Sequence, residues 1–306
     1  MDGLLVIDKP SGPTSHDVVA RMRRVLRERR IGHTGTLDPG ATGVLPLVIG
    51  RATRLARFLS AGDKSYEAIM RLGIATDTAD TEGSPLGRQY DGPLPAVEAI
   101  DRALDAFRGQ FLQRPPAFSA KKIAGRRSYD LARARLGSGS GSGSGQADIR
   151  PLPAAVTVTA HAIDIVDVDE DRLTLRVDCS AGFYVRSLAH DLGERLGTGA
   201  HLVGLRRIQS GEYSIADALP LDRAERDPDQ LRQRIVPLAR MLTKLPAISL
   251  DDDDVRRALH GRDLEAGEAR QSTERFVRLI DSGGDLVAIA ERMDTSGLLH
   301  PSVVLK

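Results

Sequence analysis

The chain has too few cysteines for disulfide bonds or a structural zinc site. Cys179 is the only cysteine in 306 residues, which excludes an internal disulfide and leaves no Cys/His cluster for structural zinc. No apolar run reaches the roughly 18 residues needed to span a bilayer, and the first residues do not resemble an export signal. We therefore expect a cytoplasmic protein with no membrane partner and no metal.

The chain also has almost no net charge. Its 43 basic and 42 acidic side chains nearly cancel, so affinity for a polyanion must come from local patches. Residues 1–60 hold ten Lys and Arg against five Asp and Glu, residues 108–136 hold eight against one, and residues 246–306 hold eight against twelve. A single basic run is usually a solvated helix face, but two such segments in a neutral chain favour contact with phosphates.

The hydrophobic pattern alternates between strands and helices. A short apolar strand at residues 3–8 is followed by a Pro/Gly turn, after which Thr14 and Asp17 have the spacing of a helix capping box. Alternating β-branched residues predict antiparallel strands at 155–179, and Gly197 is placed to end a helix. Strands without regular crossover helices predict an α+β fold with a mixed, largely antiparallel sheet.

Two breaks in the pattern predict the domain organisation. A perfect Gly/Ser repeat at residues 137–145 cannot bury anything, and we interpret it as a flexible loop or an engineered replacement for one. A second boundary precedes about sixty residues with mostly strand-like patterns. We predict a first domain at residues 1–242, which includes the repeat, and a small, mostly β domain at residues 246–306.

The segment HTGTLDPGATG at residues 33–43 places a carboxylate, Asp38, between glycines and directly before a proline. Asp-Pro commonly begins a turn, so a purely structural role stays open. The crowding of Gly35, Gly40 and Gly43 around Asp38, however, allows a ligand to approach the backbone closely. A carboxylate kept ionised there could act as nucleophile or base.

Seven segments, in this order, resemble the TruB family of tRNA pseudouridine synthases. They span roughly residues 3–215 and read DKPSGPTSHDVV (8–19), GHTGTLDPGATGVL (32–45), DKSYEA (63–68), GIATDTADTEG (73–83), RPPAFSAKKIAGRRSYDLAR (114–133), GFYVRSLAHDLG (182–193) and LRRIQSG (205–211). The resemblance implies a catalytic domain of pseudouridine synthase type, often followed by a small PUA-type RNA-binding domain. It implies isomerisation of uridine 55 in the TΨC stem-loop of tRNA, without cofactor or metal, and we expect a monomer.

The resemblance also implies three catalytic residues. Asp38 corresponds to the catalytic carboxylate, and whether it attacks C1′, adds to C6 or removes the 2′ proton stays open. Arg186 corresponds to the arginine that pairs with this aspartate, because a guanidinium favours the charged carboxylate in a dry pocket. Tyr66 corresponds to the tyrosine that stacks on uracil and is a candidate for the C5 proton transfer, although a strand tyrosine is otherwise half-buried core.

Further residues are expected to bind the substrate. The target base must leave the RNA stack, and by resemblance His33 fills the gap while Leu205 forms an apolar wall of the base pocket. Alone, His33 would be a hydrogen-bonded structural residue and Leu205 a core residue. The expected RNA-contact or pocket-shaping positions are Lys9, Asp77, Asp80, Lys121, Lys122, Arg126 and Arg127.

Two other functions are compatible with the same residues. A nucleic-acid glycosylase would break the same glycosidic bond but release free uracil. An RNA-folding chaperone would use the basic surface to open and reclose tRNA without chemistry. The acidic excess of residues 246–306 departs from an RNA-binding domain, so any RNA contact there is expected to be weak or small.

Overall fold

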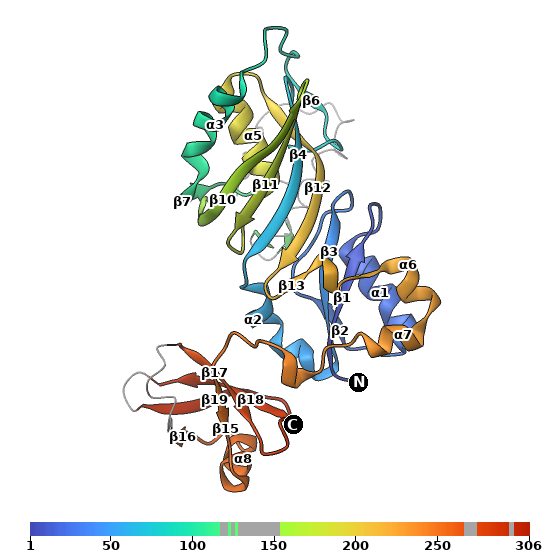
Figure 1. Cartoon of the computed structure of the whole chain (residues 1–306), viewed down its shortest axis with the longest axis vertical. Helices are drawn as coiled ribbons and strands as arrows, with labels where there is room; N and C mark the ends of the chain where they lie inside the picture. Colours follow the sequence, from blue (N-terminus) through green and yellow to red (C-terminus); the bar gives the residue numbers. More distant parts are fainter. Residues whose placement is uncertain (117–121, 124–125, 128–153, 266–273, 294–296) are drawn as a thin grey trace, which may run out of the picture. The chain divides into compact units, whose positions relative to one another are not determined.

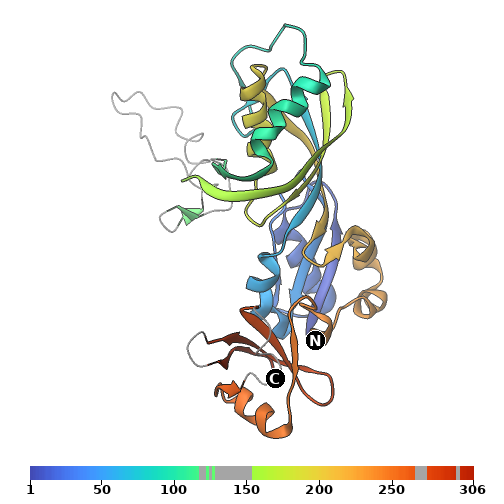
Figure 2. The ribbon, with the colours of Figure 1, turned by 60° about the vertical axis from the view of Figure 1, so that its left-hand side comes forward.

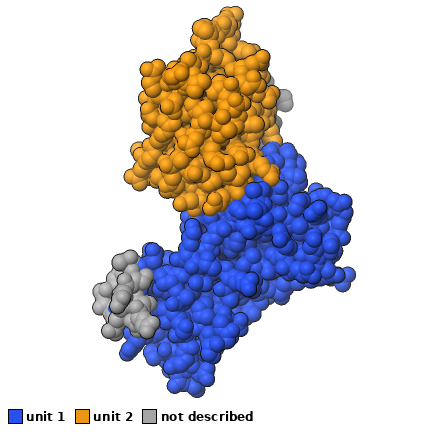
Figure 3. All heavy atoms as spheres, viewed as in Figure 1, with its two compact units in different colours: residues 1–62, 210–306 blue, residues 63–209 orange. Residues whose placement is uncertain are grey.

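The computed structural model describes residues 1–116, 122–123, 126–127, 154–265, 274–293 and 297–306. The chain divides into two compact units (Figure 3). Unit 1 consists of residues 1–62 and 210–306, and unit 2 consists of residues 63–209. None of the helices in the described part of the chain has the length and apolar character needed to cross a bilayer.

Unit 1 contains a mixed sheet with its helices and a separate C-terminal sheet (Figure 1). Its N-terminal elements are β1 (Gly3–Lys9), α1 (Ser15–Leu26), β2 (Ile31–His33), β3 (Thr42–Ile49), η1 (Gly50–Leu55) and α2 (Ala56–Ser60). Its later elements are β13 (Tyr213–Ser214), η3 (Ile215–Asp217), β14 (Leu219–Pro220), α6 (Leu221–Arg226), α7 (Pro228–Gln233) and η4 (Leu238–Arg240). The C-terminal part adds β15 (Ala247–Ser249), α8 (Asp252–Leu259), β16 (Leu264–Glu265), β17 (Phe276–Ile280), β18 (Leu286–Arg292) and β19 (Leu298–Val304).

The strands of unit 1 pair in both directions. β1 pairs with β3 antiparallel and with β14 parallel, and β2 pairs with the other end of β3. The C-terminal strands form their own sheet in the order β15-β17-β18-β19-β16. One hydrophobic core, which contains Leu4, Val44, Leu286, Ile289 and Val303, joins this C-terminal sheet to β1 and β3.

Unit 2 is built on long strands. Its elements are β4 (Lys64–Leu72), β5 (Ala75–Thr76), β6 (Pro85–Leu86), α3 (Val97–Leu104), η2 (Asp105–Phe107), β7 (Gly109–Gln113), β8 (Lys122–Ile123), β9 (Arg126–Arg127), β10 (Val156–Asp169), β11 (Arg172–Cys179), α5 (Val185–Leu196) and β12 (Ala200–Ser210). The main strands lie in the order β12-β4-β11-β10-β7, and β4, β11, β10 and β7 are antiparallel neighbours. The predicted α+β class with a mixed, largely antiparallel sheet is therefore confirmed.

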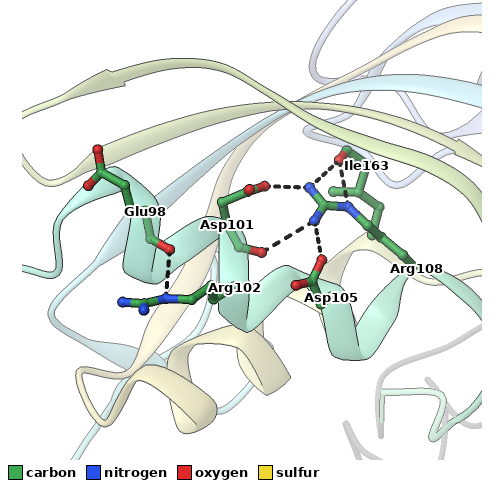
Figure 4. Close-up of polar contacts among 6 residues, drawn as sticks. All are labelled: Glu98, Asp101, Arg102, Asp105, Arg108 and Ile163. Carbon is green, nitrogen blue, oxygen red and sulfur yellow. Dashed lines mark hydrogen bonds and ion pairs between the residues drawn. The ribbon is translucent and has the colours of Figure 1, made fainter.

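Two helices cover the sheet of unit 2. α3 and α5 pack against each other, α3 also contacts β10, and α5 contacts β4 (Figure 2). Arg108 ties the end of this helical layer to the sheet, since its guanidinium donates to the carboxylates of Asp101 and Asp105 at 2.6 Å and to the carbonyl of Ile163 at 2.9 Å (Figure 4). A planar guanidinium suits this arrangement, because its fixed donors point in several directions at once.

The predicted helix signals are present at α1 and α5. Thr14 caps α1, its hydroxyl accepting the N–H of Asp17 at 3.0 Å while the Asp17 carboxylate accepts the N–H of Thr14 at 2.8 Å. Gly197 ends α5 in the left-handed conformation at φ 71°. The capping box fixes where α1 begins, and the first residue of that helix, Ser15, bonds Leu37 in the loop of Asp38.

Candidate active site

The loop between β2 and β3 presents Asp38, which is half-buried. The N–H of Ala41 donates to the carbonyl of Asp38 at 3.1 Å and closes a turn over Pro39 and Gly40. Gly43 follows at φ 100°, a conformation that a residue with a Cβ rarely adopts. The turn predicted from Asp-Pro-Gly therefore exists, and it fixes the backbone on the C-terminal side of the carboxylate.

Lys9, at the end of β1, holds this loop from within unit 1. Its ammonium group is completely buried and donates to the carbonyls of Pro10 at 3.0 Å, Pro39 at 3.0 Å and Ala41 at 2.6 Å. A buried charge is tolerated only when it is well hydrogen-bonded, and here the acceptors are the loop itself. A fully buried ammonium cannot reach an RNA phosphate. Of the two roles predicted for Lys9, its burial favours shaping the pocket over contact with RNA.

Two residues that the sequence did not single out complete the support. The hydroxyl of Ser15 donates to the carbonyl of Leu37 at 3.0 Å and accepts its N–H at 2.8 Å. The N–H of Gly12 donates to the carbonyl of Pro39 at 2.9 Å. No sequence signal identified this serine, because its partner Leu37 lies 22 residues further along the chain. Asp38 is consequently flanked on both sides by anchored residues.

His33 lies at the end of β2, where the N–H of Thr34 donates to the carbonyl of Pro46 at 3.2 Å. The imidazole of His16, in the first turn of α1, meets the His33 ring edge-on, with centroids 5.1 Å apart and planes at 87°. Such T-shaped contacts between rings are favourable and restrict ring rotation. The structure therefore gives His33 a preferred orientation, and His16 is a neighbour that the sequence did not reveal.

In unit 2, Tyr66 and Leu205 lie on the neighbouring strands β4 and β12. Tyr66 is buried and Leu205 half-buried. The strict alternation of buried and exposed residues along β4 places Lys64 on the same face as Tyr66. Burial lowers the pKa of the Lys64 ammonium group, and the positive charge of buried Arg207 on β12 lowers it further. The face of β4 that carries Tyr66 therefore also carries a buried lysine whose pKa is lowered.

Arg186, in the first turn of α5, is 8 % exposed and forms an ion pair within unit 2. Its Nη1 lies 3.4 Å from Oδ2 of Asp80 and donates to the carbonyl of Thr78 at 3.2 Å. Asp80 is itself fixed, because Oδ1 accepts the Thr78 hydroxyl at 2.5 Å and the N–H of Glu82 at 3.0 Å. The sequence predicted Asp80 as an RNA-contact or pocket-shaping residue, and the structure makes it a partner of Arg186.

The start of α5 is also held by a side chain from β7. The side chain of Tyr184, the N-cap residue of α5, does not cap the helix. Instead, the side-chain amide of buried Gln113 accepts the N–H of Tyr184 at 2.8 Å and donates to its carbonyl at 3.0 Å. The hydroxyl of Ser187 donates to the carbonyl of Arg114 at 2.8 Å. These contacts fix the helical turn that carries Arg186. Gln113 could not be found from the sequence, because its partner is 71 residues away.

The remaining predicted positions fall in the segment after β7. Lys121 and the Gly/Ser repeat at 137–145 lie outside the described residues. Lys122 and Arg126 belong to the short antiparallel strands β8 and β9, in which Lys122 pairs with Arg127 and Ile123 with Arg126. Asp77 lies in the loop of Asp80 and accepts the N–H of Ser84 at 2.9 Å.

Three arginines that contribute to the basic excess of residues 1–60 bind the C-terminal strand. Arg51 donates to the carbonyl of Leu305 at 2.6 Å, Arg54 donates to the carbonyl of Val304, and Arg57 donates to the hydroxyl of Ser302 at 3.2 Å. The basic segment at residues 50–60 therefore binds the C-terminal strand. The charge count at residues 1–60 overstated the surface available to a polyanion.

Two family models match the chain. The TruB family pseudouridylate synthase N-terminal domain matches residues 23–185, and the tRNA pseudouridylate synthase B C-terminal domain matches residues 186–243. The chain belongs to the TruB family. Its members resemble it over the whole length: tRNA pseudouridine synthase B of Solibacter usitatus is 43 % identical over 308 residues, which cover 100 % of both chains. The enzyme of that name from Pseudomonas aeruginosa is 38 % identical over 311 residues, covering 100 % of this chain and 96 % of its own.

Solved structures agree with this TruB assignment. The crystal structure of a Cbf5-Nop10-Gar1 complex matches 99 % of this chain and 85 % of its own with a TM-score of 0.72 at 27 % identity. An H/ACA RNP bound to a substrate RNA containing 2′-deoxyuridine matches the same shares with a TM-score of 0.71 at 25 % identity. As a TruB family member, the chain is a pseudouridine synthase, an isomerase that binds RNA and acts on tRNA.

Proposed function

We propose that the chain converts uridine 55 in the TΨC stem-loop of tRNA to pseudouridine, with Asp38 as the catalytic carboxylate. The observation that carries this proposal is the immobilised loop of Asp38, which Lys9, Ser15 and Gly12 hold through hydrogen bonds to its backbone. Catalysis requires a reacting group that is already in place, because misplacement by about 1 Å can cost roughly 100-fold in rate. A simple surface turn would have no need of a buried lysine beneath it.

The reaction breaks the N1–C1′ bond, turns the uracil within the pocket and rejoins it through C5, where a proton must leave. Atoms balance without an external oxidant or co-reactant, and we propose that no cofactor or metal is used. In this proposal Asp38 acts on the sugar or base, Arg186 serves as the counter-ion of the catalytic carboxylate, and Tyr66 stacks on the uracil. The fixed helical turn that carries Arg186, held by Gln113 and Ser187, supports a preorganised counter-ion.

We further propose that His33 occupies the gap left by the everted nucleotide and that Leu205 walls the base pocket. The orientation of His33 by His16 supports a stacking role, because an ordered ring loses less entropy when it binds. The enzyme is proposed to act as a cytoplasmic monomer, with its C-terminal sheet serving as a PUA-type accessory domain.

The test uses Asp38→Asn with an unmodified tRNA transcript. The amide keeps the shape but removes the charge, so we expect pseudouridine formation to fall by at least about 1,000-fold while tRNA binding is retained. Asp91→Asn, at an exposed ion pair, is the matched control and is expected to keep full activity. Pseudouridine is mapped by position, and free uracil is measured in the same reaction.

Each outcome separates the alternatives. Pseudouridine at a position other than 55 would overturn the substrate assignment, and free uracil would select the glycosylase. Normal activity of Asp38→Asn would show that Asp38 is not the catalytic group. Unfolding and refolding of tRNA by the wild type without any modification would favour the RNA chaperone.

A further inference from the structure

The ten basic residues at positions 1–60 separate into three groups in the structure. Lys9 is buried under the loop of Asp38. Arg51, Arg54 and Arg57 bind the C-terminal strand β19 and the residue after it. The other six lie at the end of α1 and in the turn that follows: Arg21, Arg23, Arg24, Arg27, Arg29 and Arg30. Of the ten, only the members of this last group are neither buried nor bound to the C-terminal strand.

Four of these residues form what we call the α1 arginine patch: Arg24, Arg27, Arg29 and Arg30. All four are exposed. Arg27 adopts the left-handed conformation at φ 52° and ends the helix, so Arg24 lies in its last turn and Arg29 and Arg30 lie in the segment that follows. The side chain of Arg23 then fixes this turn by donating to the carbonyl of Ile31 at 2.7 Å.

Little negative charge faces the α1 arginine patch. Glu28 is its nearest acid, 3.9 Å from Arg30, and Glu225 of α6 lies 3.7 Å from the neighbouring Arg21. Within the described part of the chain, Arg24, Arg27 and Arg29 have no carboxylate within 4 Å. Cations near a helix C-terminus gain from the helix dipole, but this effect is confined to the last turn, and Arg29 and Arg30 lie beyond it. Exposed Arg226, Arg232 and Arg256, by contrast, are each paired with a carboxylate on their own helix.

The position of the patch relative to the site follows from α1. Ser15, the first residue of α1, holds Leu37 next to the catalytic carboxylate, and the helix is 12 residues long. At a rise of about 1.5 Å per residue, the patch lies about 18 Å away along the helix axis. This distance is too great for the reacting nucleotide but is within reach of phosphates in an adjoining stem.

We propose that the α1 arginine patch binds backbone phosphates of the tRNA outside the modified loop. The proposal rests on the proposed function and adds a second contact surface to it. Contacts of this kind position the RNA and reduce the dissociation constant without reading sequence. They also release counterions, so their loss must change the salt dependence of binding.

The experiment compares two triple variants with the wild type. The test variant combines Arg24→Gln, Arg27→Gln and Arg29→Gln, which removes charge but leaves long side chains suited to a helix. The control combines Arg226→Gln, Arg232→Gln and Arg256→Gln, which removes three exposed arginines that are paired with Asp222, Asp229 and Asp253. Dissociation constants are measured for full-length unmodified tRNA and for a hairpin cut to the loop and its closing base pairs, from 50 to 300 mM salt.

We expect the test variant to bind tRNA about tenfold more weakly at low salt and to reduce the slope of log K against log salt by about two. The control is expected to match the wild type, kcat at saturating tRNA is expected to be unchanged, and the short hairpin is expected not to distinguish the proteins. A lysine triple variant at the same positions is expected to restore the slope, which excludes a folding defect. An unchanged slope and KM for tRNA would overturn the proposal. Because binding is measured directly, this result is independent of whether position 55 is the uridine modified.

Discussion

Replacing Lys9 by methionine tests whether the buried ammonium group holds the loop of Asp38. Methionine retains the length and the apolar stem of lysine but cannot donate to the three carbonyls that Lys9 binds. The carbonyl of Pro39 keeps the N–H of Gly12, whereas those of Pro10 and Ala41 have no other donor among the described residues. The perturbation is therefore confined to two buried acceptors and one buried charge.

The expected magnitude follows from these contacts. A hydrogen bond to a charged group contributes about 1.5–3 kcal/mol net, and two of the three acceptors lose their only donor. Methionine partly offsets this loss, because it avoids the cost of taking an ammonium group out of water. We expect the free energy of unfolding to fall by about 2–4 kcal/mol, which lowers the Tm of a unit of this size by about 5–12 °C.

Two measurements check this prediction. Differential scanning calorimetry gives the Tm, and pseudouridine formation gives kcat, which we expect to fall by about 10–100-fold because the loop loosens. Lys244→Met, at an exposed lysine, is the matched control and is expected to shift the Tm by less than about 1 °C. A Lys9→Met Tm within the same margin would refute the reasoning, since it would mean that the three hydrogen bonds carry no net stability.

The other predictions concern single side chains. Asp80→Asn removes the ion pair of Arg186 and is expected to lower kcat by about 10–100-fold with little change in KM, whereas equal effects on both would contradict a positioning role. Burial raises the pKa of the Cys179 thiol to about 12, so a thiol reagent at pH 8 is expected to label it only after unfolding. The buried hydroxyl of Tyr213 has no hydrogen-bond partner within the described residues, and Tyr213→Phe is expected to leave stability unchanged or raise it by up to about 1 kcal/mol in a denaturant titration. Arg54→Ala removes a guanidinium contact with β19, and faster proteolysis of the C-terminal sheet is expected; unchanged digestion would argue against this docking contact.

Short sequence patterns predicted the ends of helices well, because helix ends are fixed by contacts between residues close together in the sequence. The capping box at Thr14 and Asp17 predicted the start of α1, and Gly197 predicted the end of α5. α8 also begins at a local cap, because the Asp251 side chain accepts the N–H of Asp254 at 2.8 Å. In each case a side chain bonds a backbone group three or four residues away, or a glycine permits one backbone conformation, so the sequence contains the whole interaction.

The supports of the candidate site could not be predicted in the same way. Lys9 meets the Asp38 loop across about thirty residues, and Gln113 meets Tyr184 across 71. Neither residue has a periodicity or spacing that signals its partner, because the contact exists only after distant strands are brought together. The resemblance to a family identified the reacting residues, but the residues that hold them in place required the structure.

Contacts between distant residues also explain why the charge count overestimated the phosphate-binding capacity of residues 50–60. An arginine that binds backbone carbonyls and an arginine that is exposed to solvent add the same positive charge to a count along the sequence. Only the exposed arginine can bind an RNA phosphate. Arg51 and Arg54 satisfy the carbonyls of Leu305 and Val304 at the end of the last strand, where no further strand pairs with these groups in the described sheet. Buried and half-buried carbonyls need hydrogen-bond donors. Arginines are therefore expected beside a docked strand as well as on an RNA-binding surface. A count of positive charges identifies a nucleic-acid-binding surface only when the cations that bind other parts of the protein are left out. In the first sixty residues, the cations that remain lie at the end of α1.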